Sequence, residues 1–359
     1  MEKIEEKEII IITTSLGNDG AERVLTELAD EWVRCGHKVM VVQTDYNKNS
    51  CNYTLDKRVR LINLHFDRRN RFQWYFREIR YVVRLLKKHK NACVLAFLSR
   101  SFYILAISSL FVKNKLIFSE RNDPSRWPKR AIQRIMRDYA FCMADICVFQ
   151  TEDAKKHFPL KVQKKGVVIP NPCNPDLPEP YSGERRKVII SASRLTAQKN
   201  LEMMIKAFSA FIKKYPDYRL EIYGEGEERK KLEKMIRDME LQNSVFLPGF
   251  TEDIHGKMHD CAMYVCSSDY EGISNSMIEA LGMGLPTIST DCPVGGAREM
   301  ITDGENGMLI PVGDVEALCN AMVSVVEKKE LSDKLSRNAY QVRDKLQIAN
   351  IGDRWLKLM

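Results

Sequence analysis

Residues 261–286 read CAMYVCSSDYEGISNSMIEALGMGLP, and this stretch decides the fold. Its first six residues, 261–266, are all apolar, which is typical of a buried strand. Met277, Ile278 and Leu281 then recur at helical spacing, until glycines at 282 and 284 end the pattern. We therefore predict a strand, a loop and a helix in succession.

Two glutamates, Glu271 and Glu279, stand in this predicted loop and helix. Gly272 lets the backbone approach a ligand, and Ser274 and Asn275 are residue types that begin helices, where amide N–H groups point outward and attract an anion. Carboxylates accept hydrogen bonds from hydroxyl groups. A phosphate between two polyol groups, as in a nucleotide sugar, would fit this arrangement.

Composition restricts the class of protein. A chain of 359 residues with 44% apolar residues is long enough for two domains with ordinary cores. Ten cysteines occur without a C-x-x-C pair, and the charged start MEKIEEKE lacks the apolar core of a signal peptide, so we expect reduced thiols in a cytoplasm. No apolar run approaches the roughly 20 residues of a membrane-spanning helix. We expect any membrane contact to be peripheral, on the inner face of the plasma membrane.

Strand and helix patterns alternate along both halves of the chain. Five prolines in residues 170–180 interrupt them, and such a segment forms neither a helix nor a central strand. We therefore predict an α/β protein with two doubly wound domains facing each other across a cleft. The predicted parts are a first domain at 1–170, a linker at 171–186, a second domain at 187–339, and a helix at about 340–359 that packs back onto the first domain. The main predicted strands are 8–15, 38–44, 94–98, 115–118, 145–150 and 166–169, then 187–192, 219–223, 245–247, 261–266 and 287–289, with helices at 201–215, 227–240 and 315–328.

Residues 68–90 hold nine Lys or Arg and one acid, Glu78, so the basic excess of the chain, +8 in all, is local. One interpretation is a surface helix that packs its apolar stripe on the domain. The other is a helix that meets anionic lipid or a lipid-linked diphosphate, with Trp74, Tyr75 and Tyr81 at the headgroup level. We expect no nucleic acid partner, because no nucleic-acid module surrounds the patch. The apolar stripe is Phe72, Phe76, Ile79, Val83 and Leu86, and the basic stripe is Arg77, Arg80, Arg84 and Lys87.

Two loops of the first half could face a ligand. Gly17 and Gly20 follow the first strand and free the backbone of a tight turn, although such turns use glycine for geometry alone in many proteins. The polar cluster Glu120, Arg121 and Asn122 follows another strand, where open α/β sheets bind their ligands.

In the second half, Arg194 and Lys199 follow the strand at 187–192 and precede a helix, so two cations could converge on a diphosphate. A lone G-x-G around Glu225 is too weak for a dinucleotide fingerprint, and neither a G-x-S-x-G elbow nor a Walker loop is present. His255 and His259 lack a third ligand at suitable spacing, so we expect no metal site.

Six motifs together resemble the retaining glycosyltransferases of family 4, the glycosyltransferases group 1, which have a GT-B fold of two Rossmann-like domains. The resemblance covers nearly the whole chain and is most specific in its second half. The motifs are GNDGAER at 17–23, SRLTAQKN at 193–200, YGEG at 223–226, FLPGF at 246–250, EGISNSMIE at 271–279 and DGENG at 303–307.

The resemblance implies a role for each matching residue. Arg194 and Lys199 would bind the donor diphosphate and act in catalysis together with Glu271, which would hold hydroxyls of the donor sugar, while Glu279 would hold the ribose. Further donor-binding residues would be Gly224, Gly249, Phe250, Gly272, Ile273, Ser274 and Asn275, and the acceptor side would be formed by Gly17, Gly20, Glu120, Arg121 and Asn122.

Many relatives carry histidine where this chain has Arg121, which leaves the role of that position open. Family precedent favours retention of configuration, with the donor phosphate taking the acceptor proton, and requires neither a cofactor nor a metal. The basic helix resembles one in members that extend lipid-linked oligosaccharides.

Our leading hypothesis is a retaining transferase that moves a hexose or N-acetylhexosamine from a nucleotide diphosphate sugar, UDP by family frequency, to a lipid-linked or cell-surface glycan in polysaccharide biosynthesis. One alternative is a nucleotide-sugar epimerase on the same scaffold, which would equilibrate the donor without an acceptor. The other is a glycan-binding or nucleotide-sugar-binding protein without turnover.

Overall fold

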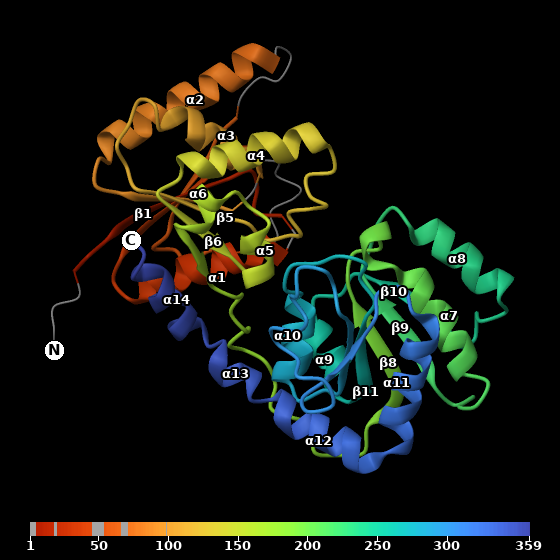
Figure 1. The fold of residues 1–359 in the computed structure, drawn as a ribbon. Helices are drawn as coiled ribbons and strands as arrows, with labels where there is room; N and C mark the ends of the chain where they lie inside the picture. Colours follow the sequence, from red (N-terminus) through yellow and green to blue (C-terminus); the bar gives the residue numbers. More distant parts are fainter. Residues whose placement is uncertain (1–4, 18–19, 45–53, 66–70, 98) are drawn as a thin grey trace. The chain divides into compact units, whose positions relative to one another are not determined.

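The computed structural model describes residues 5–17, 20–44, 54–65, 71–97 and 99–359. The chain divides into two compact units (Figure 1). Unit 1 contains Met1–Pro172 together with Ile348–Met359, and unit 2 contains Cys173–Gln347. Residues 173–186 of the predicted linker thus belong to unit 2, and the last helix of the chain belongs to unit 1.

In unit 1, seven described strands form one sheet with the order β3-β2-β1-β4-β5-β6-β7, and every neighbouring pair is parallel. The interior strand β1 contains four isoleucines, 9–12, that are completely buried, because helices cover both faces of the sheet. The strands are β1 (Glu8–Thr13), β2 (Lys38–Gln43), β3 (Arg60–Asn63), β4 (Cys93–Ala96), β5 (Leu116–Ser119), β6 (Ile146–Phe149) and β7 (Gly166–Val168).

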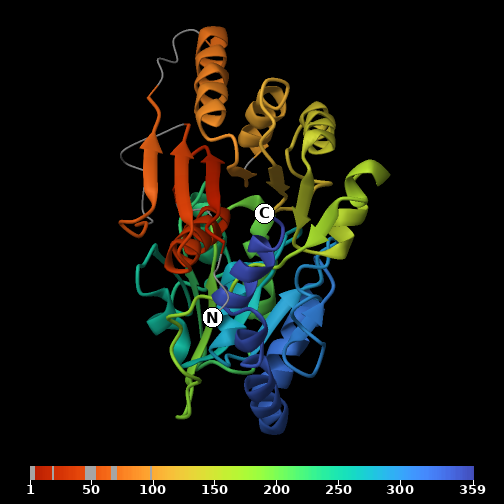
Figure 2. The same cartoon turned by 90° about the vertical axis from the view of Figure 1, so that its left-hand side faces the viewer.

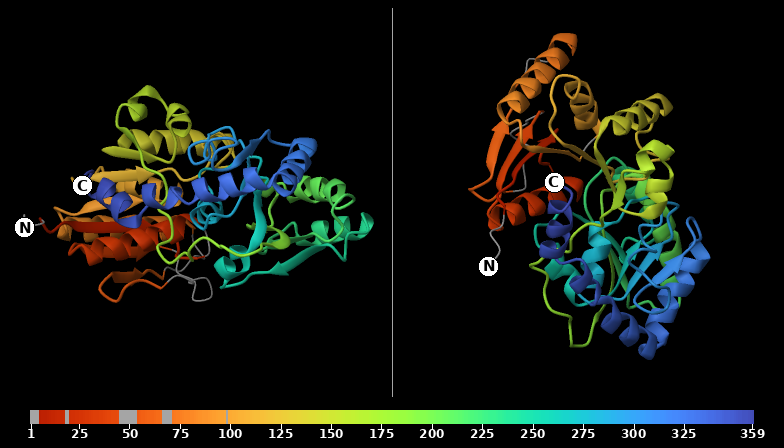
Figure 3. Two further views of the ribbon diagram at one scale, coloured as in Figure 1. Left: turned by 90° about the horizontal axis from the view of Figure 1, so that it is seen from below. Right: turned by 60° about the vertical axis from the view of Figure 1, so that its left-hand side comes forward.

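The helices of unit 1 lie in two layers. Helices α2, α3 and α4 run side by side on one face of the sheet, and α1 lies with α14 on the other (Figures 1, 2 and 3). The ring of Trp355 in α14 packs edge-on against Trp32 of α1, whose Nε1 donates to the carbonyl of Gly352 at 3.2 Å. The helices are α1 (Gly20–Arg34), α2 (Arg71–Lys88), α3 (Ser99–Ser108), α4 (Ala131–Met143), α5 (Glu152–Lys156), α6 (Leu160–Gln163) and α14 (Ile348–Leu356).

In unit 2, six strands form a second parallel sheet with the order β10-β9-β8-β11-β12-β13. Helices α7, α8 and α11 cover one face, and α9 and α10 lie on the other (Figure 1). The strands are β8 (Arg186–Ala192), β9 (Arg219–Tyr223), β10 (Val245–Gly249), β11 (Cys261–Cys266), β12 (Thr287–Thr290) and β13 (Met308–Ile310). The helices are η2 (Ala197–Lys199), α7 (Leu201–Phe211), α8 (Arg229–Asp238), α9 (Ile254–His259), α10 (Asn275–Gly282), α11 (Val315–Glu327), α12 (Lys329–Ala339) and α13 (Val342–Lys345).

The predicted strands are present in both units, with ends that differ by a few residues. The predicted helix 201–215 ends earlier, at Phe211, because the aromatic side chains of Tyr215 and Tyr218 pack back on Phe211 as the chain turns. The prediction included no strand at β3 or β13 and no helix at α3, α4 or α12.

The predicted packing of the basic helix is wrong in one respect. Helix α2 buries Trp74, Val82, Leu85 and Leu86, so Leu86 of the predicted stripe packs inward, whereas the side chain of Phe76 is 64% exposed. The ring of Trp74 lies under the Arg100 guanidinium at 3.9 Å, and Arg100 also pairs with the buried Glu78. Trp74 therefore packs inside unit 1 and cannot sit at a lipid headgroup. Residues 68–70 of the basic stretch lie outside the described residues.

Candidate active site

The strand order of unit 2 reverses between β8 and β11, which is the point where open parallel sheets bind ligands at their carboxyl edge. The loop after β8 carries Arg194 and Lys199, and the loop after β11 carries Glu271. The structure joins these loops through an ion pair between Lys199 Nζ and Glu271 Oε2, with side chains 11% and 20% exposed. The predicted cationic and carboxylate parts of the site are therefore in direct contact.

Burial by itself would lower the pKa of the Lys199 ammonium, but the neighbouring Glu271 carboxylate outweighs it and raises that pKa above its usual range. The charge of Arg194 acts in the opposite direction. Lys199 is thus a fixed positive charge at neutral pH. The Glu271 oxygen that binds Lys199, Oε2, also accepts from Ser268 Oγ at 3.0 Å, and both of these hydrogen bonds are to this oxygen and not to Oε1.

Further hydrogen bonds hold the same two loops together. Asn200 donates from Nδ2 to Asp269 at 2.6 Å, and the Gln198 amide donates to the carbonyl of Tyr270 at 2.8 Å. The hydroxyl of Ser267 donates to the carbonyl of Lys199 at 2.9 Å. The position of Lys199 is consequently determined by the β11 loop as much as by its own.

A third loop, after β9, runs close against the first. Gly224 has a φ of +133°, and a Cβ added to it would lie 2.0 Å from the carbonyl oxygen of Ser193. The amide of Gly224 donates to the carbonyl of Gly249 at 2.9 Å. Only glycine fits this contact. The structure thus brings Arg194, Gly224 and Gly249 to one edge, followed by Phe250, whose side chain is 65% exposed.

Helix α10 begins at Asn275, with Ser274 at the N-cap position, as predicted. The Ser274 hydroxyl makes no capping bond to the helix and lies 3.2 Å from Ser276 Oγ. Gly272 and Ile273 precede it in buried backbone. A Cβ added to Gly296 would lie 1.8 Å from the carbonyl oxygen of Gly272. The absence of a side chain at Gly296 therefore allows the loop around Gly272 to take its position.

Glu279 lies in α10 and is 3% exposed. His255 of α9 approaches it, with Nε2 at 3.2 Å from Glu279 Oε2. Spacing along the sequence could not reveal this contact, because His255 and Glu279 stand on different helices. Because a buried carboxylate is oriented by its neighbours, we assign His255 to the support of Glu279.

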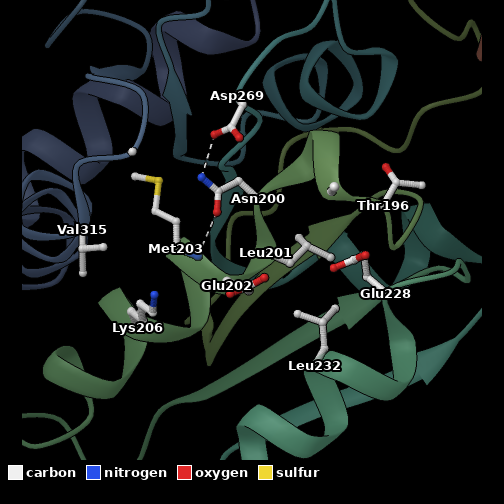
Figure 4. Close-up of a pocket in the computed structure, with 12 residues that line it drawn as sticks. Thr196, Asn200, Leu201, Glu202, Met203, Lys206, Glu228, Leu232, Asp269 and Val315 are labelled. Atoms are coloured by element: carbon white, nitrogen blue, oxygen red, sulfur yellow. Dashed lines mark hydrogen bonds between the residues drawn. The ribbon is translucent and has the colours of Figure 1, made fainter. Parts of the chain in front are cut away.

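A pocket of about 280 Å³ opens beside these loops, where α7, α8 and α11 begin (Figure 4). Asn200 and Asp269 form part of its wall, and the residues of the Lys199–Glu271 pair do not line it. Its lining consists of Thr196, Ala197, Asn200, Leu201, Glu202, Met203, Lys206, Glu228, Leu232, Asp269, Gly313 and Val315.

In unit 1, Gly17 is buried and Gly20 is exposed at the start of α1; residues 18 and 19 of that loop lie outside the described residues. Glu120 follows β5 and is 5% exposed. Burial raises its pKa to about 7, although Arg137 stands 3.6 Å away and the amides of Arg121 and Asn122 donate to its Oε1. Glu120 is therefore a buried carboxyl group that can change its protonation state near neutral pH.

The Arg121 side chain is held within unit 1. It donates to Asn171 Oδ1 at 2.9 Å, and its guanidinium stands 5.1 Å from the ring centre of Phe97 and 5.2 Å from that of Trp355. Burial lowers its pKa to about 9. Arg121 thus contacts α14 through the ring of Trp355.

The four cations predicted to meet a membrane, Arg77, Arg80, Arg84 and Lys87, are all exposed on α2. No helix in the described part of the chain is both long and apolar enough to span a bilayer. Among the described residues, no three His, Cys, Asp or Glu side chains are grouped in a way that could hold a metal ion.

Comparison with known proteins assigns the family. A model described as "Glycosyltransferase Family 4" matches residues 18–177, and one described as "Glycosyl transferases group 1" matches residues 177–342. Together they cover residues 18–342, which include most of both units. The chain belongs to the group 1, family 4 glycosyltransferases, and its two parallel α/β units have the GT-B fold.

Three similar proteins illustrate this membership. The N-acetylgalactosaminyltransferase of Campylobacter jejuni that acts on a diNAcBac-PP-undecaprenol-linked glycan is 26% identical over 98% of each chain. The poly(glycerol-phosphate) alpha-glucosyltransferase of Bacillus subtilis is 35% identical over 52% of this chain, which covers 27% of that protein. Anabaena HepE, solved with UDP-glucose, has a TM-score of 0.81 at 18% identity and covers 98% of each chain.

Proposed function

We propose that this protein is a retaining glycosyltransferase that moves a hexose or N-acetylhexosamine from a UDP-sugar to a lipid-linked or cell-surface glycan at the cytoplasmic face of the membrane. The observation that carries the proposal is the contact between Lys199 and Glu271 at the switch point of the second sheet. This contact sets a fixed cation, which can bind a diphosphate, beside a carboxylate, which can accept hydrogen bonds from a sugar. A nucleotide sugar carries both groups next to each other.

Each residue then has a role that fits its surroundings. Lys199 and Arg194 bind the diphosphate and stabilise the charge that develops on the leaving nucleotide. Glu271 accepts from hydroxyls of the donor sugar through Oε1, and Glu279, oriented by His255, accepts from the ribose. The backbone at Ile273 and Ser274 faces phosphate, and residues 248–250 lie along the base.

We propose front-face transfer, in which the bond from the sugar to the diphosphate breaks as the acceptor oxygen bonds to the same face of the sugar. The acceptor proton passes to the departing phosphate oxygen. We further propose that Arg194 and Lys199 supply the positive charge at the diphosphate, so that the reaction proceeds without a metal.

The acceptor and the membrane location follow from relatives and from α2. The Campylobacter relative acts on an undecaprenol-linked glycan. Helix α2 exposes Arg77, Arg80, Arg84 and Lys87, while its single acid, Glu78, is buried. A surface of one sign of charge is attracted to anionic lipid headgroups.

Nucleotide binding should raise the melting temperature of the wild-type protein. A ligand at 100 times its dissociation constant stabilises the folded state by about 2.7 kcal/mol. We expect UDP and UDP-sugars to give this shift in a fluorescence melting assay, GDP and ADP to give less, and Glu279→Ala to reduce the shift. If no nucleotide diphosphate changed the melting temperature, the donor site would be wrongly assigned.

Charge reversal on α2 should release the protein from anionic membranes. Each basic residue near such a surface contributes about 1 kcal/mol, so Arg77→Glu, Arg80→Glu and Arg84→Glu together should weaken partitioning into phosphatidylglycerol vesicles by about 100-fold or more. Cosedimentation measures this change. Lys230→Glu, Lys234→Glu and Arg237→Glu on α8 of unit 2 make the same change in net charge and should have little effect. Equal losses from both triple variants would mean that net charge alone governs binding.

A further inference from the structure

Helix α4 presents an apolar row to solvent. The side chains of Ile132, Ile135, Met136 and Tyr139 are 60%, 64%, 52% and 72% exposed. They recur at i, i+3, i+4 and i+7, so they share one face of the helix. The buried residues Arg137, Ala140 and Phe141 form the nearly opposite face, which packs into unit 1. The solvent side of α4 is thus apolar where an ordinary surface helix is polar.

This row belongs to a larger surface, the α2–α4 layer, formed by the adjacent helices α2, α3 and α4 (Figures 1 and 2). Phe76 on α2 is 64% exposed, and Leu110, just after α3, is 68% exposed. Within the three described helices, the acids are Glu78, which is buried, and Asp138, which pairs with the buried Arg137. Exposed charge in the layer is therefore positive.

Basic residues also flank the apolar row directly. Arg126, Lys129 and Arg130 are exposed in the segment that leads into α4, next to Trp127, which is 39% exposed. This combination of an apolar row, a tryptophan and basic flanks is typical of helices that lie in a membrane interface.

We propose that the apolar face of α4 inserts into the headgroup region of an anionic bilayer, so that the whole α2–α4 layer forms the membrane-contact surface. This inference rests on the proposed membrane location. Charge complementarity selects the occupant: a second copy of this chain would bring cations against cations, whereas anionic lipid neutralises them. Stable anchoring takes two signals, and here α2 supplies the charge and α4 the apolar contact.

The test uses the full-length protein and phosphatidylglycerol-containing vesicles. The variant Ile132→Ser, Ile135→Ser and Tyr139→Ser should partition roughly tenfold more weakly or worse, since it removes apolar area that enters the bilayer. The loss should persist at high salt, where the attraction of α2 is screened. Gln133→Ser, an exposed polar position on the same helix, should bind like wild type. Brominated lipid should quench Trp127 fluorescence in wild type, with Trp127→Phe identifying that signal.

Unchanged partitioning of the serine variant, or absence of quenching by brominated lipid, would overturn the inference even if the α2 variant lost binding. A wild-type dimer in solution that the serine substitutions turned into a monomer would also overturn it, because the row would then be a protein interface. Stabilisation by UDP should be equal in wild type and variant. If the donor site were wrongly assigned, UDP would stabilise neither the wild type nor the serine variant, and this result would not depend on vesicle binding.

Discussion

Lys199→Ala should lower kcat/KM for sugar transfer by about 10²–10³-fold. This is the effect of removing one hydrogen-bond donor that stabilises the charge developing in the transition state of a closed site. The Lys199 side chain is only 11% exposed and is paired with Glu271, so water that entered the site of the lost ammonium would not stabilise the diphosphate charge as strongly. The release of UDP from a UDP-sugar in the presence of acceptor membranes gives the rate. Arg194→Ala should act in the same direction.

Two controls separate chemistry from folding. Lys213→Ala removes an exposed ammonium just after α7 in the same unit and should leave kcat/KM within about twofold, because distant surface charges contribute little. Lys199→Ala also leaves Glu271 without its cation, so its melting temperature must be compared with that of wild type. A folded Lys199→Ala protein with the wild-type rate would show that the diphosphate binds elsewhere.

Gly224→Ala should destabilise unit 2 by about 2–4 kcal/mol and abolish nucleotide binding. The new Cβ would stand 2.0 Å from the backbone oxygen of Ser193, at a φ of +133° that an L-residue rarely adopts. The loop that carries Arg194 must then move. Thermal melting with and without UDP measures both effects.

Gly304→Ala is the matched control, because Gly304 also has a positive φ, +70°, while nothing lies within 4 Å of the added Cβ. It should cost about 1 kcal/mol from backbone conformation alone and leave UDP binding intact. Equal costs at the two positions would mean that the loop after β8 tolerates displacement.

The alternation of elements could be predicted because buried parallel strands such as β1 and β11 are short apolar runs separated by helical periodicity. The face of α2 that packs on unit 1 could not be predicted in this way. Helical spacing fits the set Trp74, Val82 and Leu85 and the set Phe76 and Val83 equally well. Only the contact between Trp74 and Arg100 decides which set is buried. Helix α4 was missed because its apolar residues occupy both the buried and the exposed face.

The candidate site was predictable where one motif carries it, as in the run from Glu271 to Glu279. It was not predictable where residues meet through the fold. His255 reaches Glu279 from another helix, and Gly296 supports Gly272 from a loop after β12. Arg121 shows the converse: its neighbourhood is completed by Trp355, at the far end of the chain. Its role on the acceptor side stays a prediction.

The most direct test of the central claim, a nucleotide-sugar site at the carboxyl edge of the second sheet, is amide hydrogen exchange with and without saturating UDP-sugar. We predict slower exchange in peptides covering 193–200 and 267–282, because ligand binding stabilises the loops that contact it. Protection confined to unit 1, or unchanged exchange in both peptides under conditions where the nucleotide raises the melting temperature, would contradict it.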